Sequence, residues 1–257
     1  KSCVIRNPKS DIPPFTPPRK FNINQHSTWS NCPIIRYICI LESLSGNHNF
    51  QLSTIHSQLN MKSELEKCLA GEPFFGGDPE IAEIAAKAKR LTRELNDTAY
   101  TDIDRKRDIM RRLFGRVGRR VHIDVDFHCE YGRHILIGDR VIINMNCTFV
   151  DNNIIEIGND VLIASNVQIY TATHSTRYAE RMLPDDGSDG CEFCLTYAKP
   201  VKICDGAWLG GGVIVLPGVT IGRNSVVGAG SVVTRSVPDN CVAVGNPCRV
   251  IKTIDNK

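Results

Sequence analysis

Aliphatic residues recur at every sixth position over the C-terminal part of the chain. The unbroken run is Ile203, Leu209, Val215, Ile221, Val227 and Val233, and the same spacing occurs in shorter stretches between Ile137 and Ile169. A period of six fits neither an α-helix, which repeats at about 3.6 residues, nor a simple strand, which repeats at two. It is typical of a parallel β-helix, in which each hexad forms a short strand and a turn and three hexads close a triangular coil. We therefore predict a mainly β fold, a parallel β-helix over residues 117–257.

The repeat is interrupted twice. Between Ile143 and Ile157 the step is fourteen residues instead of twelve, which adds two residues near Asp151. From Ile169 to the next hexad the step is 34 residues, enough to project a loop over residues 173–199. Long excursions from a rigid scaffold usually carry function. We expect functional residues at these breaks.

Residues 61–116 follow a helical pattern instead. Ser63 is positioned to cap a short helix, and the dipeptide Asp78-Pro79 suits the start of a longer one. Apolar residues then recur at helical spacing; they are Ile81, Ile84, Ala85, Ala88, Leu91 and Leu95. Thr101 resembles the first residue of a capping box for a third helix. The pattern predicts a small helical cap at the N-terminal end of the β-helix.

The first sixty residues show neither period. They hold six of the thirteen prolines and one of the twenty glycines, and runs such as Pro13-Pro14 favour an extended, unpaired backbone. The first methionine is Met61, where the ordered pattern begins. We expect residues 1–60 to be a disordered leader or a non-native extension.

Composition and charge exclude several classes of protein. The chain has 257 residues, of which 42% are hydrophobic and 23% charged, as in ordinary globular proteins. No run of eighteen uncharged apolar residues occurs, so we expect no membrane span. Residues 61–257 carry 25 basic and 26 acidic side chains, which leaves no basic excess typical of nucleic-acid binding. The eleven cysteines are scattered without a signal-peptide pattern, which predicts free thiols and a cytoplasmic location.

Two groups of residues resemble metal sites. His122, His128 and His134 are six residues apart. In a triangular coil, however, six residues move the chain to the next side of the prism, so the three imidazoles should point in different directions. Cys191 and Cys194 form a single CxxC pair without a second pair at zinc spacing. We therefore predict no metal site.

His174 stands at the start of the projecting loop, directly after a predicted strand. A neutral imidazole, with an ordinary pKa of about 6.5, suits a general base that removes a proton from a hydroxyl near neutral pH. This role requires a carboxylate or a carbonyl to orient the other ring nitrogen. A histidine that merely caps a turn fits the position equally well, so position alone leaves both roles open.

Several motifs together resemble one known family. They are Ile143-Asn144-Met145-Asn146-Cys147-Thr148, Val150-Asp151-Asn152, Ile157-Gly158-Asn159-Asp160-Val161, Thr171-Ala172-Thr173-His174, Trp208-Leu209-Gly210-Gly211-Gly212 and Gly245-Asn246-Pro247-Cys248-Arg249-Val250. From Met61 to about Lys252 the chain resembles the maltose and galactoside O-acetyltransferases, which are left-handed β-helix enzymes that use acetyl-CoA. The resemblance implies a left-handed β-helix, acetyl-CoA as co-substrate, and a homotrimer with active sites between subunits.

The resemblance also implies roles on the acceptor side of the site. His174 matches the general base that deprotonates the acceptor hydroxyl as it attacks the thioester. Asn144 matches an acceptor-binding asparagine, although an asparagine ladder that stiffens the coils would use the same residue type. Asn152 and Phe75 stand where relatives carry acceptor-contacting aspartates. Both are expected to contact the acceptor, but the loss of two charges leaves the identity of the acceptor open.

On the coenzyme side, the implied contacts come from the C-terminal coils. The implied coenzyme-binding residues are Trp208, Gly210, Gly211, Ala229, Arg235 and Arg249. The tryptophan would lie beside the pantetheine arm, although a structural role suits it nearly as well. The small residues would let the pantetheine approach backbone N–H groups, which could also bind the developing oxyanion. The two arginines would meet the coenzyme phosphates.

The residues and the resemblance together predict an acetyl-CoA-dependent O-acetyltransferase. We expect it to move an acetyl group to a hydroxyl of a sugar, such as maltose, glucose or a galactoside, by direct attack assisted by a histidine base. One alternative is a xenobiotic hydroxyl as acceptor, because Phe75 and Asn152 are uncharged. The other is a catalytically silent β-helix that serves as an assembly subunit.

Overall fold

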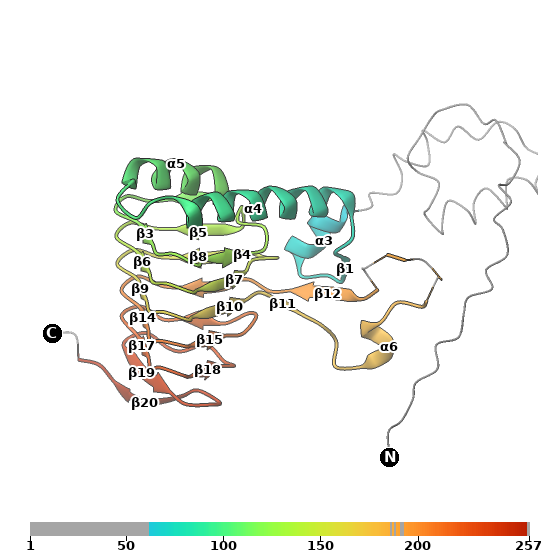
Figure 1. The fold of residues 1–257 in the computed structure, drawn as a ribbon. Helices are drawn as coiled ribbons and strands as arrows, with labels where there is room; N and C mark the ends of the chain where they lie inside the picture. The colour runs from blue at the N-terminus through green and yellow to red at the C-terminus, as the bar shows by residue number, and fades with distance from the viewer. Residues whose placement is uncertain (1–61, 186, 188, 191–192, 256–257) are drawn as a thin grey trace, which may run out of the picture. The chain divides into compact units, whose positions relative to one another are not determined.

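The computed structural model describes residues 62–185, 187, 189–190 and 193–255. Most of them wind into a stack of coils whose short strands form the faces of a triangular prism (Figure 1). This is the parallel β-helix that the six-residue period predicts. The predicted leader, residues 1–60, lies outside the described residues.

Three sheets form the faces of the prism, and the chain visits them in the same order in every coil. The first face contains β2 (Arg116–Val117), β5 (Ile135–Ile137), β8 (Ile155–Ile157), β13 (Val201–Ile203) and β16 (Thr220–Ile221). The second face contains β3 (His122–Ile123), β6 (Ile142–Ile143), β9 (Leu162–Ile163), β14 (Trp208–Leu209), β17 (Val226–Val227), β19 (Cys241–Val244) and β20 (Arg249–Thr253). The third face contains β4 (His128–Cys129), β7 (Thr148–Val150), β10 (Gln168–Tyr170), β15 (Ile214–Val215) and β18 (Val232–Val233). All neighbouring strands within these faces are parallel except β20, which is antiparallel to β19.

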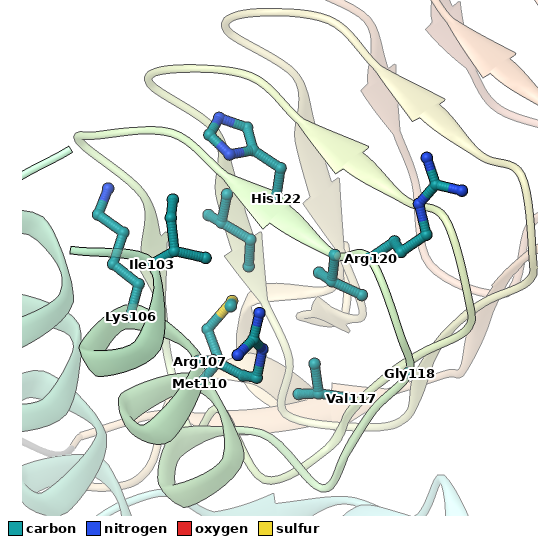
Figure 2. Close-up of a pocket in the computed structure, with 10 residues that line it drawn as sticks. Ile103, Lys106, Arg107, Met110, Val117, Gly118, Arg120 and His122 are labelled. Carbon is teal, nitrogen blue, oxygen red and sulfur yellow. The ribbon is translucent and has the colours of Figure 1, made fainter. Parts of the chain in front are cut away.

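A small cap of helices closes the N-terminal end of the prism. It consists of α3 (Glu64–Ala70), α4 (Pro79–Asp97) and α5 (Ile103–Leu113). Apolar side chains of α4 and α5 belong to the same buried cluster as the prism interior. Figure 2 shows Met110 of α5 and Val117 of β2 on the walls of a small cavity between the cap and the first coil. The cap therefore covers apolar side chains that a bare end of the prism would expose.

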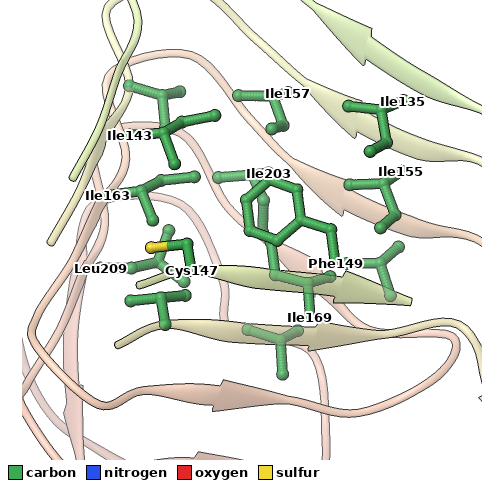
Figure 3. Packing of buried hydrophobic residues seen from close by; sticks show 14 of the residues in the cluster. Ile135, Ile143, Cys147, Phe149, Ile155, Ile157, Ile163, Ile169, Ile203 and Leu209 are labelled. Carbon is green, nitrogen blue, oxygen red and sulfur yellow. The ribbon is translucent and has the colours of Figure 1, made fainter. Parts of the chain in front are cut away.

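The hexad residues fill the interior of the prism. Ile203, Leu209 and Val215 come from three successive faces and are fully buried. Strand register stacks each of them on its equivalents in neighbouring coils, as Figure 3 shows for Ile157 and Ile203. One coil supplies a single layer of side chains, and the coils above and below cover that layer. Burying an aliphatic side chain of this size contributes roughly 1.5–3 kcal/mol relative to leaving it exposed.

Local capping decides where the helices begin. Ser63 and Glu66 form a reciprocal capping box, with distances of 3.1 Å from Glu66 N to Ser63 Oγ and 2.7 Å from Ser63 N to Glu66 Oε2. The third helix begins one residue later than the sequence suggests, because its cap is Asp102 rather than Thr101. Asp102 Oδ1 accepts a hydrogen bond from Arg105 N at 3.2 Å. A carboxylate also interacts favourably with the positive end of the helix dipole, which a hydroxyl does not.

The arm (residues 172–199) projects from the prism at the second break in the repeat (Figure 1). It contains β11 (Ala172–Thr173), α6 (Tyr178–Arg181) and β12 (Leu195–Ala198). Strand β12 pairs antiparallel with β11 on one side and with β1 (Phe74–Phe75) of the cap on the other. The segment that the sequence analysis describes only as a projecting loop therefore contains regular secondary structure and is hydrogen-bonded to the cap.

The structure also bears on the groups that resemble metal sites. His122 lies on the second face, His128 lies on the third, and His134 precedes β5 of the first. Within the described ranges no three His, Cys, Asp or Glu side chains form a group that could hold a metal ion. Cys191 lies outside the described residues, and Cys194 is half-buried. No helix in the described part of the chain is long and apolar enough to cross a bilayer.

Candidate functional site

The arm fixes the orientation of the His174 ring. His174 follows β11 directly and is exposed. Its Nδ1 lies 2.9 Å from the main-chain oxygen of Leu195, at the start of β12. A carbonyl oxygen can only accept a hydrogen bond, so Nδ1 must carry the proton. In the neutral imidazole the other ring nitrogen, Nε2, then keeps its lone pair, which a general base needs.

The same three-stranded sheet brings Phe75 close to His174. Phe75 of β1 pairs with Leu195 of β12, whose carbonyl orients the His174 ring. The Phe75 ring is half-buried, and its main-chain N–H donates to Glu64 Oε2 at 2.7 Å. Glu64 thereby fixes β1 to the first helix of the cap. Of the predicted acceptor residues, Phe75 is the one that shares a sheet with the histidine.

A buried polar cluster lies where the cap and the arm meet the prism. We call it the junction; its residues are Cys68, Tyr131, His134, Asp151, Asn152, Asn153 and Thr171. It contains the first break in the hexapeptide repeat, which falls between β7 and β8. Most of its polar groups are hydrogen-bonded to one another or to the main chain, as burial requires.

Asn153 joins the three parts of the structure within the junction. Its side-chain amide donates to the carbonyl of Cys68 in the cap at 2.9 Å and to that of Ala198 in the arm at 3.4 Å. Its main-chain N–H donates to Thr171 Oγ1 at 2.9 Å, just before the arm leaves the prism. Asn153 is 2% exposed. This residue therefore links the cap and the root of the arm to the same coil.

Asn152 is buried in the junction rather than open to solvent. Its Nδ2 donates to the Tyr131 hydroxyl at 2.9 Å, while no donor among the described residues reaches its Oδ1. The predicted contact with the acceptor is therefore not evident in the single chain: one half of the amide is used inside the protein, and the other half is covered.

Asp151 is the most strongly perturbed carboxyl of the junction. Burial raises its pKa to about 7, although the main-chain N–H groups of Tyr131 and Glu130 donate to its Oδ1 at 2.8 and 2.9 Å and act in the opposite direction. No donor in the described part of the chain reaches Asp151 Oδ2. Desolvation thus outweighs the two hydrogen bonds, because the second oxygen has no compensating partner. Burial also lowers the pKa of the neighbouring His134.

The corner between the second and third faces holds three of the six predicted coenzyme residues, Gly210, Gly211 and Ala229. Gly210 follows β14, and the Gly228-Ala229 pair follows β17 one coil further on. Asn144 follows β6 on the same corner, and its Nδ2 donates to the Ile163 carbonyl of the adjacent coil at 3.1 Å. Such a bond between neighbouring coils stiffens the stack, as an asparagine ladder would. It leaves the amide oxygen of Asn144 available to a ligand.

Glycines at this corner serve different purposes. A Cβ at Gly210 would lie 2.6 Å from Ala229 N, so close packing of the coils requires a glycine there. At Gly211 the nearest atom to such a Cβ would be Ser165 O at 3.5 Å, which leaves room for a ligand. The main-chain ladder between described coils uses the N–H groups of Gly210 and Gly212 but not that of Gly211. Gly211 can therefore present an N–H group to a bound carbonyl or oxyanion.

The remaining predicted coenzyme residues lie on three parts of the prism. Trp208 lies on the outer side of β14 and is 50% exposed. Arg249 begins β20 at the C-terminal end of the stack, and its guanidinium donates to the Cys248 carbonyl at 2.8 Å. Arg235 is exposed and follows β18, at the corner between the third and first faces from which the arm also leaves. Arg235 therefore shares a corner with the His174 arm.

Within one chain the predicted site is divided between two corners. The arm with His174 and Phe75 leaves from the corner between the third and first faces, whereas Asn144 and Gly211 lie at the corner between the second and third faces. The width of the third face separates the two groups. Sequence reasoning missed the Leu195 carbonyl and the linking role of Asn153. The length of the second break predicts that a segment projects there. No pattern of side chains can show which main-chain carbonyl accepts the hydrogen bond from His174.

Comparisons with known proteins identify the family and the fold. The maltose acetyltransferase hexapeptide capping motif matches residues 67–118, and the bacterial transferase hexapeptide, a set of six repeats, matches residues 200–235. A galactoside O-acetyltransferase of Lactococcus lactis subsp. lactis is 37% identical over 186 residues, which cover 72% of this chain and 85% of that protein.

Two solved structures extend the comparison. A maltose O-acetyltransferase from Clostridium difficile 630 is 43% identical with a TM-score of 0.70, covering 77% of this chain and 100% of that chain. A hexapeptide-repeat acetyltransferase from Vibrio cholerae, solved in complex with acetyl coenzyme A, is 39% identical with a TM-score of 0.66, covering 76% and 100%. The predicted left-handed β-helix is thereby confirmed. The chain belongs to the maltose and galactoside O-acetyltransferase family.

Proposed function

We propose that the protein is an acetyl-CoA-dependent O-acetyltransferase that acetylates a sugar hydroxyl, with His174 as the general base. The single observation that carries the proposal is the hydrogen bond from His174 Nδ1 to the Leu195 carbonyl, which leaves Nε2 able to accept a proton. Family membership supports the reaction class, and a relative solved with acetyl coenzyme A supports the acyl donor.

The reaction follows from these groups. Nε2 of His174 removes the proton from the acceptor hydroxyl while its oxygen attacks the carbonyl carbon of the thioester. The resulting oxyanion accepts a hydrogen bond from a main-chain donor such as Gly211 N–H. When the intermediate collapses, the carbon–sulfur bond breaks and the proton held by His174 passes to the coenzyme thiolate. The products are an acetyl ester and the free thiol of the coenzyme.

We further propose that the active enzyme is a homotrimer whose sites lie between chains. The division of the site between two corners supports this, because a second chain could bring its Asn144 and Gly211 beside the His174 arm of the first. An exposed apolar stripe on the second face supports it too. The stripe consists of Ile142, Leu162 and Trp208 on neighbouring strands, which are 40, 46 and 50% exposed. Contiguous exposed apolar side chains of this kind are typical of interfaces.

A hydroxyl on a more apolar acceptor, such as a xenobiotic, is the second candidate. The observation that favours it is the half-buried ring of Phe75, which pairs with Leu195 beside His174 where relatives carry a charged residue. We also propose a cytoplasmic location, because buried thiols such as Cys68 act as protonated hydrogen-bond donors, here to the Asn152 carbonyl at 3.0 Å.

Release of free thiol from acetyl-CoA across a panel of sugars and xenobiotic alcohols tests the proposed reaction. We expect His174→Ala to lower kcat by roughly a hundredfold or more, within the range for loss of a general base, with little change in coenzyme affinity. His128→Ala, a change to another exposed histidine, is the matched control and should retain activity. Loss of coenzyme binding without loss of turnover would show that His174 is not the base, and no thiol release with any acceptor would favour a silent subunit.

Mixed trimers test whether sites are shared. His174→Ala and Asn144→Ala chains should each be nearly inactive, but a site between chains can combine an intact histidine from one with an intact asparagine from the other. After joint unfolding and refolding in equal amounts, about a quarter of the sites should be complete. Failure to regain activity, with trimers formed, would place both residues of each site in one chain.

A further inference from the structure

The Asn153 amide, at the shorter break of the repeat, bonds to two other parts of the structure at once. Its Nδ2 donates to the carbonyls of Cys68 at 2.9 Å, Leu69 at 3.2 Å and Ala198 at 3.4 Å. Its Oδ1 accepts from the main-chain N–H of Ile154 at 2.7 Å. An amide has two N–H groups, so one of them is shared between two of the three carbonyls. Because the residue is 2% exposed, any effect on a reaction must pass through the groups that it holds.

A first route leads from Asn153 to His174 through the root of the arm. The main-chain N–H of Asn153 donates to Thr171 Oγ1 at 2.9 Å, one residue before β11 begins. Its Nδ2 bonds to Ala198, which ends β12 and pairs with the first residue of β11. Asn153 therefore holds both strands at the rung where their pairing begins. The register set at this rung decides which carbonyl of β12 lies beside the ring that follows β11.

A second route leads through the cap. Two of the carbonyls that Asn153 binds lie in the last turn of α3, where carbonyls have no i→i+4 partner within the helix. Glu64, in the first turn of the same helix, accepts from the main-chain N–H of Phe75 at 2.7 Å. Phe75 pairs with Leu195, whose carbonyl lies 2.9 Å from His174 Nδ1. Both routes therefore converge on the carbonyl that orients the ring, where α3, β1, β12 and β11 meet (Figure 1).

We propose that Asn153 is a positioning residue for acetyl transfer, which sets the place of the Leu195 carbonyl and thereby keeps His174 Nε2 free of a proton. The inference rests on the proposed function, because it takes His174 as the base. In a neutral imidazole the proton can sit on either nitrogen, and the hydrogen bond of one nitrogen fixes the choice. A displaced carbonyl would leave part of the population with Nε2 protonated, and those molecules could not accept the proton of the acceptor hydroxyl.

Asn153→Asp is the main test, because aspartate keeps the shape of the side chain but its carboxylate cannot donate to the three carbonyls. We expect kcat per folded chain to fall about tenfold to a hundredfold, as for a misplaced catalytic group. The KM for acetyl-CoA should not change, because Asn153 contacts none of the predicted coenzyme residues in the described chain. Nitrogen NMR of protein with labelled histidine should show His174 protonated at Nδ1 in the unaltered protein and a mixture of tautomers in the variant.

Thr171→Val decides the question if Asn153→Asp does not fold. Valine has the shape of threonine, but it removes the hydroxyl that accepts from Asn153 N and donates to the Val150 carbonyl at 2.7 Å. We expect kcat and the tautomer of His174 to change in the same direction by a smaller factor, because the amide of Asn153 still holds Ala198. An unchanged kcat and an unchanged tautomer would then overturn the proposal.

Asn96→Asp is the matched control. Asn96 of α4 also joins the cap to the prism by two bonds: its Nδ2 donates to the Phe127 carbonyl at 2.9 Å, and its Oδ1 accepts from Phe127 N at 3.1 Å. Asn96 has no bond to the arm among the described residues. The control should therefore lose stability, while its kcat and the tautomer of His174 stay normal.

Two results would overturn the role of Asn153 alone. One is an unchanged kcat or an unchanged tautomer in folded Asn153→Asp. The other is an equal loss of kcat in Asn96→Asp, because that loss would come from any loosening of the cap. Full turnover in His174→Ala is a different result: it would refute the proposed base itself, and with it any catalytic role for a residue that orients the ring.

Discussion

The interior of the repeating coils is filled by apolar side chains, whereas the interior of the junction is filled by polar ones. In the coils, every sixth side chain is aliphatic and fully buried, as Ile157, Ile163 and Ile169 illustrate. In the junction, buried positions are occupied by Asp151 and Asn153, whose polar atoms need partners from the cap, the arm and the neighbouring coil. The coils are stabilised by apolar burial, whereas the junction is held by directed hydrogen bonds.

This difference explains where chemistry can be added to such a fold. The inward positions of a hexad are fully buried, so a polar group placed there must find a partner inside the prism, as Ser225 does with the Pro238 carbonyl at 2.6 Å. The breaks in the repeat escape this limit, because extra residues leave the prism and pair with other elements. His174 lies at the longer break and Asn153 at the shorter one. The repeat supplies a rigid frame, and its longer interruption carries the proposed base, His174.

Phe149→Ala tests the coil side of the comparison and should have the larger effect. Phe149 is fully buried, and its ring centre lies 5.1 Å from that of Phe127. Truncation should lower the free energy of unfolding by about 3–5 kcal/mol, through lost burial and the cavity left behind. Chemical denaturation measures this. Turnover per folded chain should stay near normal, because Phe149 lies inside the prism rather than in the arm. Thr148→Ala, on the outer side of β7, is the control and should change stability little.

Asp151→Asn tests the junction side through pH. A carboxyl whose pKa is about 7 in the folded chain and about 3.9 in the unfolded chain keeps its proton up to a higher pH in the folded state. The unaltered protein should therefore lose stability as pH rises from about 4 to about 7, with no further loss from this group above that range. The two pKa values differ by about three units, each worth about 1.4 kcal/mol, so the titration of Asp151 can change the free energy of unfolding by about 4 kcal/mol at most. The neutral amide of the variant lacks this dependence.

The measurement is the difference in unfolding free energy between Asp151→Asn and the unaltered protein across this pH range. The depressed pKa of His134 acts in the opposite direction, since its contribution is lost as pH falls below about 6.5. That contribution is present in both proteins and cancels in the difference. A difference that does not vary with pH would mean that Asp151 is ionised throughout, so its two main-chain hydrogen bonds would outweigh desolvation.

Much of the frame could be read from the chain, and the errors are instructive. The sequence predicts Thr101 as the cap of α5, one residue before the observed cap Asp102, because both residues are good caps and only the folded backbone selects between them. The arm was identified by its length, but its pairing with the cap through β12 and Phe75 could not be deduced. The contact of Asn152 with the acceptor stays a prediction, and the bond from its Nδ2 to the Tyr131 hydroxyl inside the junction is a tertiary contact that no spacing in the sequence indicates.

The β-helix and its helical cap could be predicted from the sequence, and the family resemblance singled out His174 as the candidate base. A six-residue period is a local property: wherever it continues, it dictates which side chain points inward, regardless of what lies far along the chain. Which carbonyl orients His174 depends on the folded chain, because Leu195 lies 21 residues away and meets the histidine through the pairing of β11 with β12.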